Sequence, residues 1–476
     1  MTKSSSFEQR IDDALNDQQV RQNFRSAMAG FIERRDVQFP DGDSLQQRRD
    51  NAAAIRLRAL RQLPGLLEKL EGRLIENGIQ VHWADSADQA NQVIAAILNS
   101  NHVKKVVKGK SMVTEEIEMN HYLEQRGIQV IESDLGEFII QLAGETPSHI
   151  VVPAVHKNRQ QISALFQKHI QGSAYTEDVD ELTAIARKEL RHHFATADAG
   201  ISGVNFMVAE TGTLCLIENE GNGRMTTTVP PLHIAVTGIE KVIEKLSDLP
   251  PLLDLLPKSA TGQPITTYVN MISRPRQGHE LDGPRQVHLV LVDNGRSHIQ
   301  AQESFIDTLR CIRCGACMNH CPVYTQVGGH AYGTTYPGPI GIVLEPQKQG
   351  LQQIGDLLSA CSLCGRCGEV CPVEIPLPDL ISKLRHQAVK SPSDPATSLV
   401  KGQGALKRWP EALVWRLWAW VHAHAGLYQV MARSIGRLRG LMPRRIKGWS
   451  RYRSAPRPAR RSLHEQVKGM QEIADE

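Results

Sequence analysis

Apolar side chains recur at helical spacing through about the first 75 residues, with polar and charged residues between them. The clearest series is Ile55, Leu60, Leu63, Leu66, Leu67 and Leu70. A repeat near 3.6 residues places such side chains on one face of a helix, and that face packs against a core. The pattern therefore predicts a helical N-terminal region over residues 1–77.

From residue 78 the pattern changes to short β-branched runs that alternate with helical stretches. The strand candidates are residues 79–83, 103–107, 128–131, 150–152, 205–208, 213–217, 233–236 and 287–292. The helix candidates are residues 88–98, 113–125, 157–167 and 179–194. Strands that alternate with helices are typical of βαβ units and a largely parallel sheet. We therefore expect an α/β domain over residues 78–295.

Eight of the nine cysteines lie in a third region, residues 296–390, as two copies of one motif. The copies are Cys311, Cys314, Cys317 and Cys321, then Cys361, Cys364, Cys367 and Cys371, and each ends in Cys-Pro. This C-x2-C-x2-C-x3-C-P spacing is typical of [4Fe–4S] ligands, and the fourth cysteine normally ligates the other cluster. It predicts two [4Fe–4S] clusters. One takes Cys311, Cys314, Cys317 and Cys371, and the other takes Cys361, Cys364, Cys367 and Cys321.

Structural zinc and disulfides are the alternatives for these cysteines. Zinc sites use separated C-x2-C pairs, and disulfides conflict with an N-terminus that lacks the apolar segment of a secretion signal. The 39 residues between Cys321 and Cys361 favour a mainly α-helical two-cluster domain over a small bacterial ferredoxin. The ninth cysteine, Cys215, lies in an apolar strand candidate, so we expect a buried and inert thiol.

The α/β region has no GxGxxG after its first strand candidate, no P-loop and no HExxH, so bound flavin or nicotinamide is not indicated. Three segments instead concentrate polar residues where strand candidates end: residues 108–116, 209–213 and 218–226. Open α/β sheets bind ligands at the carboxyl ends of their strands. These segments are therefore the candidate ligand site.

These three segments, with residues 134–140 and 145–153, resemble the lactate-utilisation domain. Together with the cysteine motifs and residues 328–333 and 336–341, they resemble the lactate utilisation protein B family over roughly residues 50–390. Members of that family are iron–sulfur subunits of a three-component L-lactate dehydrogenase. The resemblance implies a sheet related to the CoA-transferase and sugar-isomerase folds. It also implies electron flow from L-lactate oxidation toward the respiratory chain.

The same resemblance implies two partner subunits, one with cysteine-rich CCG-type repeats and one with a second lactate-utilisation domain. Two other functions remain open. The chain could be an electron-carrying scaffold for the oxidation of another 2-hydroxy acid such as glycolate, with a partner binding the substrate. The second alternative, which rests only on similarity of fold, is a CoA-transferase-like enzyme with an attached ferredoxin domain.

A small 2-hydroxy acid needs a cation for its carboxylate and a base for its hydroxyl proton. Arg224 is the candidate residue for binding the carboxylate through its guanidinium, with Lys110 as a second cation. Gly221 and Gly223 leave backbone N–H groups free to bind an anion. The candidate bases are Glu210, Glu218 and His233, with Glu115 as a further possibility. The remaining candidate substrate contacts are Ser111, Thr211, Asn219 and Asn222.

The alternative for this site is structural. Arg224 could pair with Glu218 or Glu220, and the glycines could simply serve a turn. Glu115 could be an ordinary acid in the first turn of a helix. We expect His149 and His156 to be structural, because they lack partners at metal-ligand spacing.

The net charge of +4 hides a strongly basic tail, residues 391–476. Residues 401–461 contain fifteen Lys or Arg and one acid, so the rest of the chain has a balance of −10. The tail also carries Trp409, Trp415, Trp418, Trp420 and Trp449, and its spacing predicts one helix over residues 410–432. No run is apolar enough to span a bilayer, so we expect a soluble, cytoplasmic chain. An apolar helix beside a polybasic segment predicts peripheral contact with the inner face of the membrane, or docking on a partner. No nucleic-acid-binding motif accompanies it.

Overall fold

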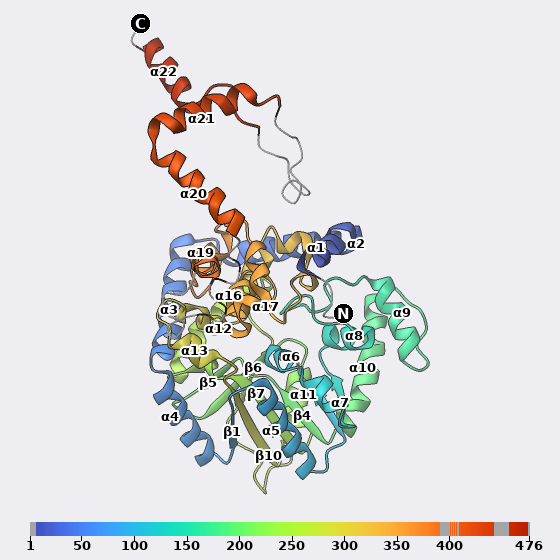
Figure 1. Ribbon diagram of the computed structural model, residues 1–476. Coiled ribbons are helices and arrows are strands. Elements are labelled where there is room, and N and C mark those ends of the chain that lie inside the picture. The colour runs from blue at the N-terminus through green and yellow to red at the C-terminus, as the bar shows by residue number, and fades with distance from the viewer. Residues whose placement is uncertain are drawn as a thin grey trace. The chain divides into compact units, whose positions relative to one another are not determined.

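The computed structural model describes residues 6–390, 409–441 and 457–474, together with residues 400, 402, 404 and 406. The chain forms two compact units, residues 1–405 and residues 406–476 (Figure 1). The first unit contains the helical N-terminal region, the α/β region and the cysteine region together. The predicted boundaries at residues 77, 295 and 390 stay predictions.

The N-terminal region is helical, as its periodicity predicts. Its helices are α1 (Phe7–Asn16), α2 (Gln18–Gln38), α3 (Gly42–Arg61) and α4 (Leu63–Glu76). Leu63, Leu66, Leu67, Leu70 and Leu74 form the buried face of α4 and pack on the sheet described next. Phe24 and Met28 of α2 are buried as well.

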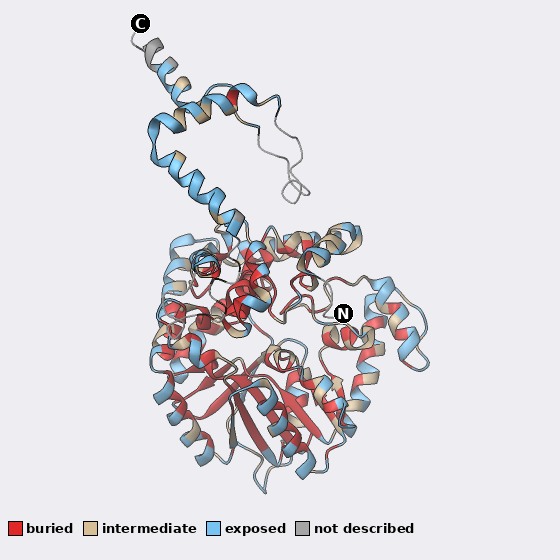
Figure 2. Ribbon diagram, in the orientation of Figure 1, coloured by how far each residue is buried: buried red, intermediate tan, exposed pale blue. Residues whose placement is uncertain are grey.

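A six-stranded, wholly parallel sheet forms the centre of the α/β region, in the order β1-β10-β7-β4-β2-β3. The strands are β1 (Gln80–Ala84), β2 (Lys105–Lys108), β3 (Gln129–Glu132), β4 (Ala199–Ser202), β7 (Leu232–Gly238) and β10 (Gln286–Val292). Successive residues of β10 face opposite sides: Leu289 and Leu291 pack with α4, whereas Val290 and Val292 pack with α5. Both faces are thus covered, as a parallel sheet requires, and its strands are buried in Figure 2.

The helices of this region are α5 (Ala87–Ser100), α6 (Met112–Glu116), α7 (Met119–Glu124), α8 (Leu135–Ala143), α9 (Arg159–His169), α10 (Val179–Thr196), α11 (Asn222–Thr228), α12 (Leu249–Ala260) and α13 (Arg296–Gln300). A second, four-stranded sheet has the order β8-β5-β6-β9. Its strands are β5 (Phe206–Val208), β6 (Thr213–Glu218), β8 (Val242–Ile243) and β9 (Tyr268–Ile272). Cys215 lies in β6 and is fully buried, and burial raises its pKa to about 12, so the thiol stays protonated.

The cysteine region consists of short helices around two loops. They are α14 (Ala316–Asn319), α15 (Tyr324–Val327), α16 (Gly338–Gln349), α17 (Leu351–Ile354), α18 (Arg366–Glu369) and α19 (Leu377–Val389), with 3-10 turns at Ile306–Arg310, His330–Tyr332 and Gly355–Ser359. The second unit contains α20 (Trp409–Ala423), α21 (Ala425–Leu438) and α22 (Leu463–Ala474). Among the described residues, no helix is both long enough and apolar enough to cross a bilayer.

Three predicted elements were wrong. Residues 150–152 form no strand, because the backbone N–H groups of Val151 and Val152 both bond to Nδ1 of His149 and close a local turn. The helix over residues 113–125 is split where Glu118 adopts a φ of 53°. The tail helix over residues 410–432 is split at His424, which has an extended backbone and is followed by the poor helix former Gly426.

Acidification is expected to destabilise the first unit through His233. This residue of β7 is fully buried, and burial together with the neighbouring His288 lowers its pKa from 6.5 to about 4. Its neutral form therefore contributes stability that is complete above pH 6.5 and is lost as the pH falls toward 4. The full effect is on the order of 3 kcal/mol. Thermal unfolding measured at pH 7 and at pH 5 should show that acidification lowers the stability of His233→Gln less than that of the wild type. The same substitution at the exposed His192 should leave the loss unchanged.

Candidate functional site

A cavity of about 290 Å³ lies where the parallel strands end. Residues 109–113 enter it directly after β2, and Ser202 and Gly203 enter it at the end of β4. The opposite wall comes from the cysteine region, through Ile312, Arg313, Cys314 and Tyr336. We call this the ligand cavity. It joins the carboxyl edge of the sheet to the first cysteine loop, residues 311–321.

Six of the predicted site residues line the ligand cavity: Lys110, Ser111, Glu218, Asn219, Asn222 and Gly223. Several of them also hold local structure. Ser111 caps the N-terminus of α6 by accepting a hydrogen bond from Thr114 N–H. Glu218 accepts hydrogen bonds from the backbone N–H groups of Gly223 and Arg224 at 3.2 and 2.9 Å, so its carboxylate anchors the start of α11.

The other six predicted residues lie outside the cavity lining: Glu115, which pairs with Lys108, and Glu210, Thr211, Gly221, Arg224 and His233. Glu210 accepts a hydrogen bond from Leu246 N–H, and Thr211 donates to Thr213. Gly221 has a φ of 81° at the N-terminus of α11, and Arg224 is exposed on that helix. His233 reaches the cavity only through Ser202, whose Oγ lies 2.8 Å from His233 Nε2.

The cavity gains further charged residues that the sequence interpretation missed: Asp134, Glu220, Lys241 and Arg313, together with the phenol of Tyr336. Burial and the neighbouring Asp134 raise the pKa of Glu220 to about 7. Burial and the neighbouring Arg313 lower the pKa of Lys241 to about 7. One signal was visible in the sequence, since Arg313 stands between the first two cysteines of the first motif.

The two cysteine loops, residues 311–321 and 361–371, repeat the same backbone geometry. Arg313 and Leu363 both have a positive φ, of 63° and 56°, and so do Gly315 and Gly365, at 78° and 84°. In each loop the residue two positions after the first cysteine donates its N–H to that cysteine's Sγ, at 3.4 Å from Arg313 and 3.3 Å from Leu363.

The last cysteine of each motif also accepts a backbone N–H. Tyr324 donates to Cys321 Sγ at 3.5 Å, and Ile375 donates to Cys371 Sγ at 3.3 Å. N–H groups directed at sulfur stabilise cysteine thiolates and tune the clusters that they hold. All nine cysteines are free of disulfides. The donor set therefore fits [4Fe–4S] clusters.

Cysteines of the two loops raise one another's pKa across the gap between the motifs. Burial raises the pKa of Cys314, and Cys371 of the second loop raises it further. Burial likewise raises the pKa of Cys321, and among the cysteines Cys361 and Cys364 raise it further. Coupling of this kind requires proximity, so it supports the crossed ligation that the spacing predicts.

Cationic side chains bond to the backbone carbonyls of these cysteines. Lys241 donates to Cys311 at 3.2 Å, Arg49 to Cys371 at 2.9 Å and Arg385 to Cys361 at 2.6 Å. A [4Fe–4S] cluster with four thiolates carries net negative charge, and nearby cations stabilise it. The cations around the two cysteine loops therefore also suit [4Fe–4S] clusters.

A buried ionic network joins the α/β region to the cysteine region. Arg296 contacts both carboxylate oxygens of Glu116, at 2.7 and 2.9 Å, and its Nε lies 2.6 Å from Glu240. Lys348 and the hydroxyl of Tyr336 also bond to Glu116. All of these side chains are at most 5% exposed. The network fixes the wall of the cavity that carries Tyr336.

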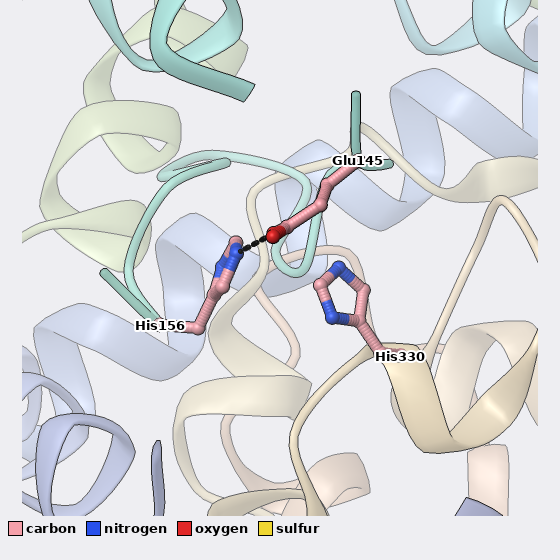
Figure 3. Close-up of side chains that lie close together, drawn as sticks. All are labelled: Glu145, His156 and His330. Carbon is pink, nitrogen blue, oxygen red and sulfur yellow. Dashed lines mark hydrogen bonds and ion pairs between the residues drawn. The ribbon is translucent and has the colours of Figure 1, made fainter. Parts of the chain in front are cut away.

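Glu145, His156 and His330 form a second polar cluster between these regions, with one ligand atom of each within 4.8 Å of the others (Figure 3). His156 Nε2 lies 2.7 Å from Glu145, Lys157 pairs with the same carboxylate, and His330 Nε2 donates to the Thr146 carbonyl. Burial alone would raise the pKa of Glu145, but the bonds from Lys157 and His156 lower it. Each group thus has a protein partner, and the cluster fastens the 145–156 segment to His330.

Comparison with known proteins agrees with this architecture. Family models match residues 67–292 (LUD domain), 307–375 (4Fe-4S dicluster domain) and 383–472 (lactate utilisation protein B, C-terminal). Fold and site together define an iron–sulfur electron-transfer protein that carries a LUD domain. Its match to lactate utilisation protein B of Bacillus cytotoxicus has 39% identity over 97% of this chain and 96% of the relative. The chain belongs to the lactate utilisation protein B family.

Two further relatives cover most of the chain. Lactate utilisation protein B of Shouchella clausii is 39% identical over 98% of this chain and 97% of its own. The electron transport protein YkgF of Escherichia coli K12 is 42% identical over 90% of this chain and 87% of its own. A crystal structure of a DUF162 family protein from Deinococcus radiodurans matches 48% of this chain and 98% of its own, with 15% identity and a TM-score of 0.28.

Proposed function

We propose that this chain is the iron–sulfur subunit of a complex that oxidises L-lactate to pyruvate and passes the electrons toward the respiratory chain. Its relatives carry the names lactate utilisation protein B and electron transport protein. The strongest support is that a single cavity is lined both by residues at the carboxyl ends of the sheet strands and by Cys314. Substrate and first electron acceptor then lie next to each other within one chain.

We further propose that the chain holds two [4Fe–4S] clusters. The first takes Cys311, Cys314, Cys317 and Cys371, and the second takes Cys361, Cys364, Cys367 and Cys321. Bound there, the clusters accept and release electrons one at a time. Cys364 is exposed, whereas Cys314 is buried at the ligand cavity. Cys314 would thus hold the first cluster beside the cavity, and the exposed Cys364 would hold the second cluster where an external redox partner can reach it.

The charges in the ligand cavity suit a small 2-hydroxy acid. Lys110 and Arg313 supply positive charge for a carboxylate, and Asp134, Glu218 and Glu220 supply acceptors for a hydroxyl. Glu220, whose pKa is raised to about 7, is suited to hold a proton near neutral pH. A volume of about 290 Å³ falls at the small end of ligand pockets.

The proposal predicts that the assembled complex reduces an artificial electron acceptor when L-lactate is supplied. The partners are proposed to be a subunit with CCG-type repeats and one with a second LUD domain. Replacing Cys314 by Ser removes a cluster ligand at the cavity, so it should abolish turnover, whereas Cys215→Ser should leave turnover unchanged. Turnover with glycolate but not with lactate would correct the substrate. Full activity of the Cys314 variant would contradict the proposal.

The tail is proposed to hold the complex on an anionic membrane surface. Trp409, Trp415, Trp418 and Trp420 of α20 are 77, 57, 51 and 52% exposed, and Arg433–Arg461 adds eleven cations without an acid. Trp449 lies outside the described residues. Each cation near an anionic surface contributes about 1 kcal/mol. A chain that ends at residue 405 should therefore lose binding to anionic phospholipid vesicles, measured by co-sedimentation. Equal sedimentation of both chains would contradict this role.

A further inference from the structure

We propose that Arg313 binds the carboxylate of the substrate, a role that the sequence suggested for Arg224. The proposal rests on the proposed function, because it takes the ligand cavity as the place of a 2-hydroxy acid. Arg313 lines that cavity, whereas Arg224 lies outside its lining. The side chain of Arg313 is 12% exposed, so it meets the cavity without facing bulk solvent.

One end of the Arg313 guanidinium lacks a hydrogen-bond partner among the described residues. Its Nη2 lies 3.4 Å from Glu240 Oε1, but its buried Nη1 has no hydrogen-bond partner within the described part of the chain. A buried, charged donor left without an acceptor costs at least about 1–3 kcal/mol. A carboxylate in the cavity would satisfy that donor with a charge-assisted hydrogen bond.

The guanidinium is held in place before any ligand binds. It lies over the ring of Tyr336, 4.4 Å from the centroid, and the hydroxyl of Tyr336 donates to Glu116 at 2.8 Å. Glu240 is itself fixed by Arg296. A fork that is already oriented loses little conformational entropy when it binds a planar carboxylate.

The local charge balance favours an added anion. Arg56, Arg296 and Arg313 surround the buried Glu240, and Glu116 is shared between Arg296 and Lys348. Positive groups thus outnumber the two carboxylates. The missing negative charge is supplied on one side by the cysteine thiolates and on the other by the carboxylate of the ligand.

The position of Arg313 has a consequence for specificity. Because Arg313 stands between Cys311 and Cys314, a carboxylate bound to it lies against the loop that carries three ligands of the first cluster. The acidic residues Asp134 and Glu220 belong to the same lining and are left for the hydroxyl group. We infer that the cavity favours an acid that carries a neighbouring hydroxyl.

The test is the binding of oxamate, an unreactive analogue of pyruvate and lactate, to the assembled complex by calorimetry. Arg313→Lys keeps the charge but loses the two-pronged geometry, so oxamate should bind about tenfold more weakly or worse. Arg224→Lys is the matched control and should bind oxamate like the wild type. Iron content and the EPR signal of the reduced clusters show whether Arg313→Lys keeps its clusters. Wild-type affinity in an Arg313→Lys chain with both clusters would overturn the proposal.

A second measurement does not depend on any variant. Oxamide replaces the carboxylate of oxamate by a neutral amide, so the wild-type complex should bind it about tenfold more weakly or worse. Equal affinities would overturn the role of Arg313 and leave lactate oxidation standing. Failure of the wild type both to bind oxamate and to turn over lactate would overturn the proposed function as well.

Discussion

Replacing both Cys311 and Cys371 by Ser should remove one cluster, whereas replacing both Cys311 and Cys321 by Ser should remove both clusters. The first pair is proposed to ligate a single cluster although the two residues come from different motifs. The second pair comes from one motif but is proposed to ligate different clusters. Iron analysis of anaerobically reconstituted chains should give about four atoms per chain for the first double Ser variant and near zero for the second, against about eight in the wild type.

The single variants Cys311→Ser and Cys371→Ser are the controls. Each should lose about four iron atoms, and the double variant should lose no more than either alone. Ligation within each motif would reverse the result, because Cys311 and Cys321 would then share a cluster. That reversed pattern would contradict the crossed arrangement. Cys215→Ser should retain the full iron content, since its thiol is buried in β6.

Arg296→Met should destabilise the first unit by about 3 kcal/mol, the lower end of the cost of breaking a buried ion pair, because Lys348 still pairs with Glu116 and Arg313 with Glu240. Arg296 is fully buried and contacts both Glu116 and Glu240, which are 3% and 1% exposed. Methionine fills part of the volume but cannot neutralise either carboxylate. Denaturant unfolding followed by circular dichroism should show an earlier transition. The cysteine loops should lose iron in parallel, because the same network fixes Tyr336.

Arg274→Met is the matched control for that prediction. Arg274 also pairs with a carboxylate in a two-pronged contact, at 2.9 and 2.7 Å from Glu280, but this pair lies at the surface. Exposed ion pairs contribute at most about 1 kcal/mol. The two variants therefore separate the effect of burial from the loss of an ion pair as such. Similar losses in both variants would contradict the role given to the buried network.

Much of the fold follows from the hydropathy pattern, and the exceptions have physical causes. The parallel sheet was predictable because most of its strands are β-branched runs between helices. The strand β4 was missed because Ala199, Gly200 and Ser202 give no such run. It forms because neighbouring strands and Thr226 pack tightly against Gly200, where a Cβ would lie 1.9 Å from the Thr226 carbonyl oxygen. Tertiary packing there overrides local propensity.

The candidate site was only half predictable for a similar reason. Lys110 and Ser111 follow the end of the parallel strand β2, so the rule for open sheets identifies them, and Asn219 follows β6 of the second sheet. Arg313 and Tyr336 lie far along the chain from all three, and only the packing of the cysteine region against the sheet brings them to the same cavity. Arg224 was a reasonable choice from its Gly-rich surroundings, but the α11 helix carries it to the surface.

The central claim is that the ligand cavity opens onto the first cluster within this chain. The most direct test is electron–nuclear double resonance on the reduced complex with ¹³C-labelled oxamate bound. We expect a ¹³C hyperfine coupling to one cluster signal, which disappears in Cys371→Ser and persists in Cys364→Ser. Oxamate that binds tightly but shows no coupling to either cluster would contradict it.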